Sequence, residues 1–131
     1  MSADAEPIKI LLVEDDENDI FFFQRALSQA GANARVHVER DGAQAMDYLK
    51  GVQSGNQPTP DLIFLDLKMP NVNGFEVLAW LREQSFTDTL KVLVLTSSVL
   101  PKDMDTAVSL GADKCFTKPI SPEALRDLLA A

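Results

Sequence analysis

The sequence has few of the features that mark secreted, disulfide-linked or membrane-spanning proteins. A single cysteine, Cys115, among 131 residues excludes an internal disulfide and is consistent with a reducing cytosol. No apolar run approaches the ~20 residues that a membrane-spanning helix requires. The N-terminus lacks the basic and apolar regions of a secretory signal. We therefore expect a cytoplasmic protein that is not anchored in a membrane.

Positive charge is also scarce. The chain has 12 Lys and Arg against 20 Asp and Glu, so its formal net charge is -8. This acidity argues against unaided binding to nucleic acid or to an anionic membrane surface. A length of 131 residues suits one domain with a single sizeable core. We expect residues 1–7 to be a polar tail and residues 8–131 to form a free-standing domain.

Short apolar runs predict the strands of a parallel sheet. Ile8–Val13, Leu62–Leu65 and residues 90–95 are nearly continuous apolar runs of strand length, as expected for strands buried on both faces. Ala34–Glu39 alternates between apolar and polar residues, which predicts an edge strand with one solvent-exposed face. Lys114–Thr117 is short and predicts a fifth strand.

Helical segments with start and stop signals separate these strands. Acidic residues and Gly31 mark the ends of the first helix, and residues 43–52 and 75–83 predict two more. Pro101 and Pro122 lie where the last two helices begin. Regular alternation of strands and helices predicts a doubly wound α/β domain with five parallel strands in the order 2-1-3-4-5.

In such a sheet the carboxyl ends of the strands meet at one edge, where open α/β proteins bind their ligands. Polar residues follow four of the predicted strands and are expected to converge there. They are Glu14, Asp15, Asp66, Thr96 and Lys118. Three carboxylates and one ammonium leave about two uncompensated negative charges. Oxygen ligands without His or Cys nearby favour Mg2+, with Mn2+ as the alternative, over zinc.

Asp66 is the best candidate for a nucleophile because it ends the most central strand and precedes a loop. A carboxylate that attacks a phosphoryl donor forms an acyl phosphate. A metal on Asp15 and Asp66 would neutralise the phosphoryl oxygens, while Lys118 and Thr96 would donate hydrogen bonds to them. Each residue alone has an ordinary structural explanation, and only their combination points to this chemistry.

Four motifs carry a resemblance to a known family. ILLVEDD, LDLKMPNVNG, VLTSS and GADKCFTKPI occur in this order on the expected elements. Over nearly its whole length the chain resembles the receiver domain of two-component response regulators. The resemblance implies a flavodoxin-like receiver fold for residues 8–131. It also implies that Asp66 is the phosphoacceptor, Thr96 the switch hydroxyl and Lys118 the phosphate-pairing lysine.

The same resemblance implies a metal site and a set of partners. Glu14, Asp15 and the backbone carbonyl of Lys68 would help to bind Mg2+, and Lys118-Pro119 would be a cis peptide. The phosphoryl donor would be a phosphohistidine on a sensor histidine kinase or a histidine phosphotransfer domain. The receiver would catalyse only its own phosphorylation and dephosphorylation, and would signal to a downstream protein as a monomer or homodimer. QSGNQPTP and NDIFFFQRAL resemble receivers that serve phytochrome-like and hybrid kinases.

Three other functions fit the residues less well. A metal-dependent phosphohydrolase needs a second acid two residues after its nucleophile, where this chain has Lys68, and usually a cap domain that 131 residues cannot accommodate. A flavodoxin-type electron carrier needs a Ser/Thr/Gly-rich phosphate loop, where this chain has Glu14, Asp15 and Asp16. A receiver that no longer accepts phosphate is disfavoured by the intact acidic set.

Some positions depart from the family pattern or leave two explanations open. Cys115 stands where receivers usually carry Tyr or Phe, and alternation turns Phe116 to the opposite side of the strand. Cys115 is then either a redox sensor or, as we expect, an inert side chain. Lys68 is expected to project over Asp66 and to change the lifetime of a phosphoryl group.

Phe21 and Phe22 lie outside the apolar stripe of the first helix. They pack either against a neighbouring helix or against a partner protein.

Overall fold

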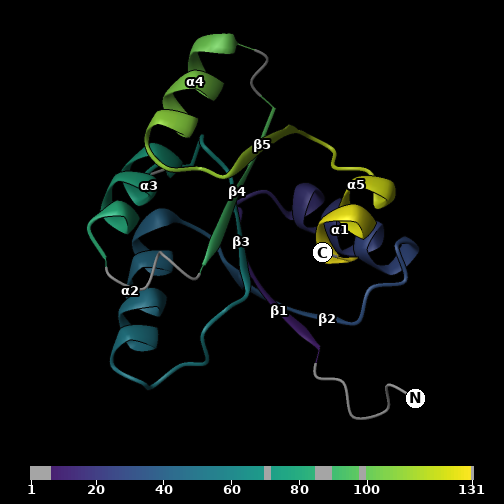
Figure 1. Cartoon of the computed structure of the whole chain (residues 1–131), viewed down its shortest axis with the longest axis horizontal. Helices are drawn as coiled ribbons and strands as arrows, with labels where there is room; N and C mark the ends of the chain where they lie inside the picture. The colour runs from purple at the N-terminus through teal and green to yellow at the C-terminus, as the bar shows by residue number, and fades with distance from the viewer. Residues whose placement is uncertain (1–6, 70–71, 85–89, 98–99, 131) are drawn as a thin grey trace.

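A single parallel sheet in the order β2-β1-β3-β4-β5 is the centre of the molecule (Figure 1). The computed structural model describes residues 7–69, 72–84, 90–97 and 100–130. Within these ranges there are five strands and five helices. The strands are β1 (Ile8–Val13), β2 (Ala34–Glu39), β3 (Leu62–Leu65), β4 (Lys91–Thr96) and β5 (Lys114–Thr117). The strand order and the half-exposed edge strand β2 confirm the predictions from the hydrophobic pattern.

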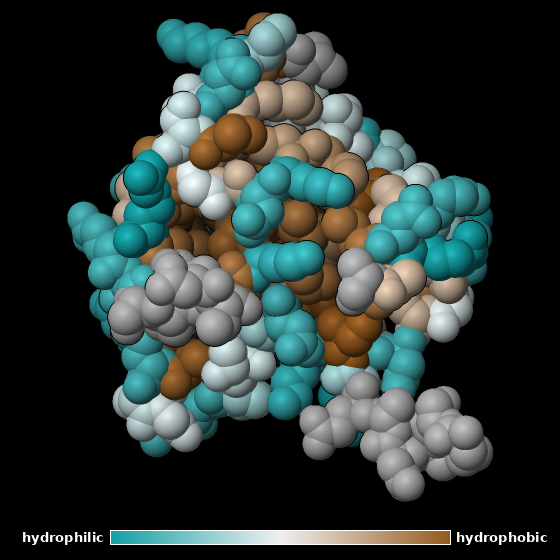
Figure 2. All heavy atoms as spheres, in the orientation of Figure 1, coloured by the Kyte–Doolittle hydropathy of each residue, from teal (hydrophilic) through white to brown (hydrophobic). Residues whose placement is uncertain are grey.

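Helices cover both faces of the sheet, as Figure 1 shows. They are α1 (Glu17–Gln29), α2 (Gly42–Gln53), α3 (Gly74–Arg82), α4 (Pro101–Ser109) and α5 (Pro122–Ala130). Alternate residues of a strand point to opposite faces. Leu11 and Val13 therefore pack with the side chains of α2 and α3, whereas Ile10 and Leu12 pack with those of α1 and α5. Figure 2 shows hydrophobic side chains gathered in the middle of the face seen in Figure 1, partly covered by hydrophilic ones.

Local signals fix the helix that follows β1. Asp16 caps α1, because its carboxylate accepts hydrogen bonds from the backbone N–H groups of Asn18 and Asp19 at 2.8 and 3.1 Å. The helix ends at Gln29, and two residues later the chain turns at Gly31, whose φ of 70° is a left-handed conformation that glycine adopts without strain. Helical spacing predicts that Ile20, Phe23, Leu27 and Ala30 face the sheet. The first three are buried as predicted, whereas Ala30 is half-buried.

The start of α3 explains the glycine of the motif LDLKMPNVNG. A Cβ atom on Gly74 would overlap the backbone carbonyl of Asp66 and the Cα of Leu67. The Gly74 N–H donates to the carbonyl of Leu67 at 3.0 Å, and a capping box between Asn73 and Glu76 begins the helix. Only glycine permits α3 to start this close to the end of β3, so it holds the loop after Asp66 in place.

Parts of some predictions lie outside the described residues. Of the predicted tail at residues 1–7, only Pro7 is described, and the predicted loop at residues 85–89 is not. The helices in the described ranges include none with the length and apolar character that crossing a membrane requires.

Candidate functional site

The structure brings the predicted polar residues together at the carboxyl edge of the sheet. Glu14 and Asp15 follow β1, Asp66 follows β3, Thr96 ends β4 and Lys118 follows β5. Glu14, Asp66 and Thr96 are almost completely buried, with 2%, 6% and 0% of their surface exposed. Asp15 is exposed. Asp and Glu are rarely buried unless they are paired, so the two buried carboxylates at this edge require partners.

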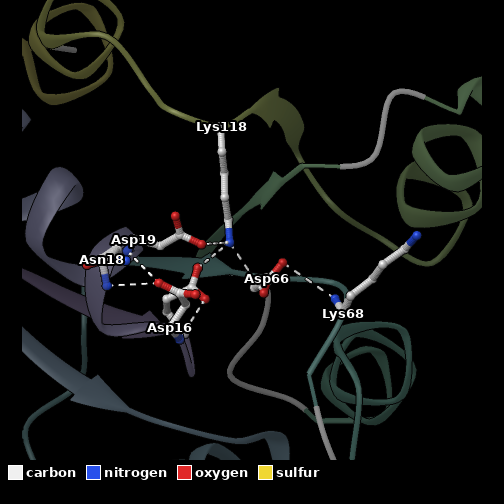
Figure 3. A network of polar contacts seen from close by, with 7 residues as sticks. Asp16, Asn18, Asp19, Asp66, Lys68 and Lys118 are labelled. Atoms are coloured by element: carbon white, nitrogen blue, oxygen red, sulfur yellow. Dashed lines mark hydrogen bonds and ion pairs between the residues drawn. The ribbon is translucent and has the colours of Figure 1, made fainter.

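Lys118 is the centre of the polar network drawn in Figure 3. Its Nζ lies 2.5 Å from Glu14 Oε1, 2.8 Å from Asp19 Oδ2 and 3.4 Å from Asp66 Oδ2. The Lys118 backbone N–H donates to the carbonyl of Thr96 at 2.8 Å, and the following peptide bond to Pro119 is cis, as predicted. Lys118 therefore connects the ends of three strands with the first turn of α1.

Asp19 is the member of this network that was not predicted from the sequence. It lies in the first turn of α1, where an acidic residue is already favoured by the helix dipole. The helix dipole already explains an acid at this position, so the sequence offered no separate reason to assign Asp19 to the site. Asp19 lies one turn after the capping residue Asp16, and side chains of a helix point back toward its N-terminus, which here faces the strand ends.

Three carboxylates are arranged to hold a cation. Oxygen atoms of Glu14, Asp15 and Asp66 all lie within 4.8 Å of one another. Carboxylate oxygens are ligands for hard divalent cations such as Mg2+, Mn2+ and Ca2+. The donor set fits a divalent metal ion, since Lys118 alone does not balance the negative charge of these acids.

The pKa values reflect this crowding of acids. Burial raises the pKa of Glu14 to about 7, the charge of Asp66 adds to the effect, and the hydrogen bond with Lys118 opposes it. Burial also raises the pKa of Asp66, again against the charge of Lys118. For Lys118, burial lowers the pKa, but hydrogen bonds to Asp19 and Glu14 raise it overall. The site therefore keeps its lysine charged and favours additional positive charge near its acids.

Lys68 differs from the prediction that its side chain lies over Asp66. Its backbone N–H faces Asp66 Oδ1 at 3.4 Å, but its side chain points away from Asp66, as Figure 3 shows. The Lys68 Nζ lies 4.0 Å from Asp103 Oδ2 on α4, and the side chain is 62% exposed. An effect of Lys68 on the phosphoryl lifetime stays a prediction.

Cys115 and Phe116 point to opposite faces of the sheet, as predicted. Cys115 packs among the side chains of the α2–α3–α4 layer, with Sγ 4.0 Å from the backbone carbonyl of Met104. Phe116 packs with the side chains of the α1–α5 layer. Burial raises the pKa of the Cys115 thiol, which lowers the thiolate fraction that oxidation requires. This environment supports the inert alternative over the redox sensor.

Phe21 and Phe22 are large apolar side chains that stay exposed on α1. They are 58% and 48% exposed, and their rings contact each other edge to face with centroids 5.6 Å apart. Packing against a neighbouring helix is therefore the wrong explanation, and a contact with a partner stays a prediction.

Comparison with known proteins agrees with this geometry. The model of the response regulator receiver domain family matches residues 10–130, so the chain belongs to the response regulator receiver family. It is a phosphoryl-accepting signalling domain of the two-component type, rather than a phosphohydrolase or a flavodoxin-type electron carrier.

Individual response regulators are similar to this chain over most of its length. Response regulator Rcp1 of Synechocystis sp. is 36% identical over 122 residues, which cover 90% of this chain and 82% of Rcp1. The structure of the Mn2+-bound form of Rcp1 has a TM-score of 0.78 at 32% identity, covering 94% of this chain and 89% of Rcp1. The structure of the phosphorylated cyanobacterial phytochrome response regulator RcpA also has a TM-score of 0.78, at 34% identity, covering 95% of this chain and 89% of RcpA.

Proposed function

We propose that Asp66 is the residue that accepts the phosphoryl group. The observation that carries this proposal is the position of its carboxylate. It is 6% exposed at the end of the central strand, 3.4 Å from Nζ of Lys118. It also shares a cluster with Glu14 and Asp15 in which oxygen atoms lie within 4.8 Å of one another. In the part of the chain that the structure describes, this is the only group of three or more His, Cys, Asp or Glu side chains that could hold a metal ion.

The donor in this proposal is a phosphohistidine of a sensor kinase or a phosphotransfer domain. An oxygen of the Asp66 carboxylate attacks phosphorus, an O–P bond forms, and the N–P bond of the phosphoimidazole breaks. The imidazole leaves with the electron pair and takes up a proton from solvent. The products are an acyl phosphate on Asp66 and a neutral histidine on the donor.

The side chains around Asp66 have separate roles in this transfer. Lys118 donates a charge-assisted hydrogen bond to one phosphoryl oxygen, and the Thr96 hydroxyl donates to another. Glu14, Asp15, Asp66 and the backbone carbonyl of Lys68 would hold Mg2+, or alternatively Mn2+, which would supply positive charge beside the transferred group. A solved structure of the relative Rcp1 is of its Mn2+-bound form, which supports the binding of a divalent ion.

Reversal of phosphorylation completes the proposed signalling cycle. The receiver catalyses its own phosphorylation and the hydrolysis of its acyl phosphate, and turns over no other substrate. Phosphorylation adds about -1.5 to -2 charge beside Thr96 and Lys118, which changes the surface that a downstream protein recognises. We infer that residues 8–131 act as one receiver unit in the cytoplasm, as a monomer or homodimer, without direct contact to nucleic acid.

Phosphorylation by a small donor tests the proposal. The protein is incubated with acetyl phosphate and Mg2+, and the intact mass is measured. We expect the gain of one phosphoryl group in wild type and none in Asp66→Ala or after addition of EDTA. Asp105→Ala is the matched control, because it makes the same substitution at an exposed carboxylate on α4, outside the site. A phosphoryl group on Asp66→Ala would contradict the assignment.

A further inference from the structure

Asp19 contacts the lysine of the site, but the proposed phosphoryl transfer leaves it without a role. Nζ of Lys118 lies 2.8 Å from Asp19 Oδ2 and 3.4 Å from Asp66 Oδ2. In the unphosphorylated protein the ammonium group is therefore closer to α1 than to the phosphoacceptor. Figure 3 shows the side chains of Asp19 and Lys118 pointing toward each other across the site.

The hydrogen bonds of Lys118 are already fully used in this state. An ammonium group has three N–H donors and accepts nothing. The carboxylates of Glu14, Asp19 and Asp66 surround it, one for each donor. A phosphoryl group on Asp66 brings three further acceptor oxygens and about -1.5 to -2 charge. The donor that faces Asp66 can pass to a phosphoryl oxygen, but Nζ now lies 2.8 Å from Asp19 and 3.4 Å from Asp66. Movement of Nζ toward the phosphoryl group therefore lengthens its contacts on the α1 side.

Burial decides whether the contact with Glu14 or the contact with Asp19 lengthens more easily. The Glu14 side chain is 3% exposed, so water cannot readily replace Lys118 there and a weaker contact is costly. The Asp19 side chain is 35% exposed, so water can replace Lys118 there. We propose that Asp19 is a positioning residue that holds Lys118 on the α1 side of the site and competes with the phosphoryl group for its ammonium. This inference rests on the proposed phosphorylation of Asp66.

The variant Asp19→Asn tests the competition while keeping the shape of the side chain. The rate of phosphorylation by acetyl phosphate and the affinity for beryllofluoride, a phosphoryl mimic, are measured at saturating Mg2+. A partly exposed ion pair is weak, so we expect both quantities to rise about fivefold, equivalent to about 1 kcal/mol. Asp19→Glu keeps the carboxylate, so we expect its phosphorylation rate and beryllofluoride affinity to stay close to those of wild type. A merely structural role of Asp19 would not predict this difference between Asp19→Asn and Asp19→Glu.

Glu17→Gln is the matched control. Glu17 lies in the same first turn of α1, but its 74% exposed side chain pairs with Arg40 rather than with Lys118. The Glu17→Gln substitution removes one negative charge from the same helix end as Asp19→Asn. We expect the phosphorylation rate and the beryllofluoride affinity to change by less than about twofold, as for an exposed ion pair. Circular dichroism and thermal unfolding confirm that each variant is folded.

The possible outcomes separate this inference from the proposed function. An unchanged or lower rate and affinity in Asp19→Asn would overturn the competition. An equal increase in Glu17→Gln would also overturn it, because the effect would then come from general charge rather than from the contact. A wild-type protein that takes up no phosphoryl group overturns the proposed function itself.

Discussion

The free energy of unfolding should fall as the pH rises when no divalent ion is present. Burial raises the pKa of Glu14 from its ordinary value of 4.5 to about 7. The folded protein therefore binds more protons than the unfolded chain between these values, so stability decreases with pH across this window. A shift of this size corresponds to about 3 kcal/mol at 1.36 kcal/mol per pH unit. The raised pKa of Asp66 contributes with the same sign.

Urea denaturation in EDTA at about pH 5 and about pH 7.5 measures this loss. Glu14→Gln has no group that titrates at this position, so its stability should depend less steeply on pH. Saturating Mg2+ binds the deprotonated carboxylates and should restore stability at the higher pH. The reasoning is refuted if wild-type stability is constant or rises over this range, or if Glu14→Gln shows the same slope.

Three further predictions concern single residues. Lys118→Met should weaken beryllofluoride binding by about tenfold or more, measured by calorimetry, because a charge-assisted hydrogen bond is lost; unchanged affinity would contradict the pairing. Gly74→Ala should lower the free energy of unfolding by about 1–3 kcal/mol in urea titration, because its Cβ overlaps the backbone after β3. Gly51→Ala, which meets only the flexible Gln57 side chain, is its control. Cys115 should react more slowly with iodoacetamide at neutral pH than free cysteine does, given its raised pKa; a faster reaction would revive the redox alternative.

The hydrophobic pattern was sufficient to predict the sheet because burial on two faces leaves little ambiguity. Leu62–Leu65 is apolar throughout and became the central strand β3, whereas Ala34–Glu39 alternates and became the edge strand β2. Once the strand order is known, the convergence of Glu14, Asp66 and Lys118 follows from the geometry of parallel strands. The positions of these three residues follow from the arrangement of the backbone alone.

The directions of long or surface side chains were not predictable in the same way. Lys68 is close to Asp66 in sequence, but its side chain points away from Asp66 and its Nζ lies 4.0 Å from Asp103 on α4. Asp19 reaches Lys118 across 99 residues of sequence, a contact that the helix periodicity alone does not reveal. Phe21 and Phe22 lie outside the buried stripe that contains Ile20 and Phe23, and 58% and 48% of their surface stays exposed. Such contacts depend on tertiary neighbours that no local pattern contains.

Chemical identification of the phosphorylated residue tests the central claim most directly. Borohydride reduces an aspartyl phosphate to homoserine, so the modified position can be found by peptide mass spectrometry after phosphorylation with acetyl phosphate and Mg2+. We predict homoserine at position 66 and at no other acid. Homoserine at another Asp, or its absence from a protein that has gained a phosphoryl group, would contradict the assignment of Asp66.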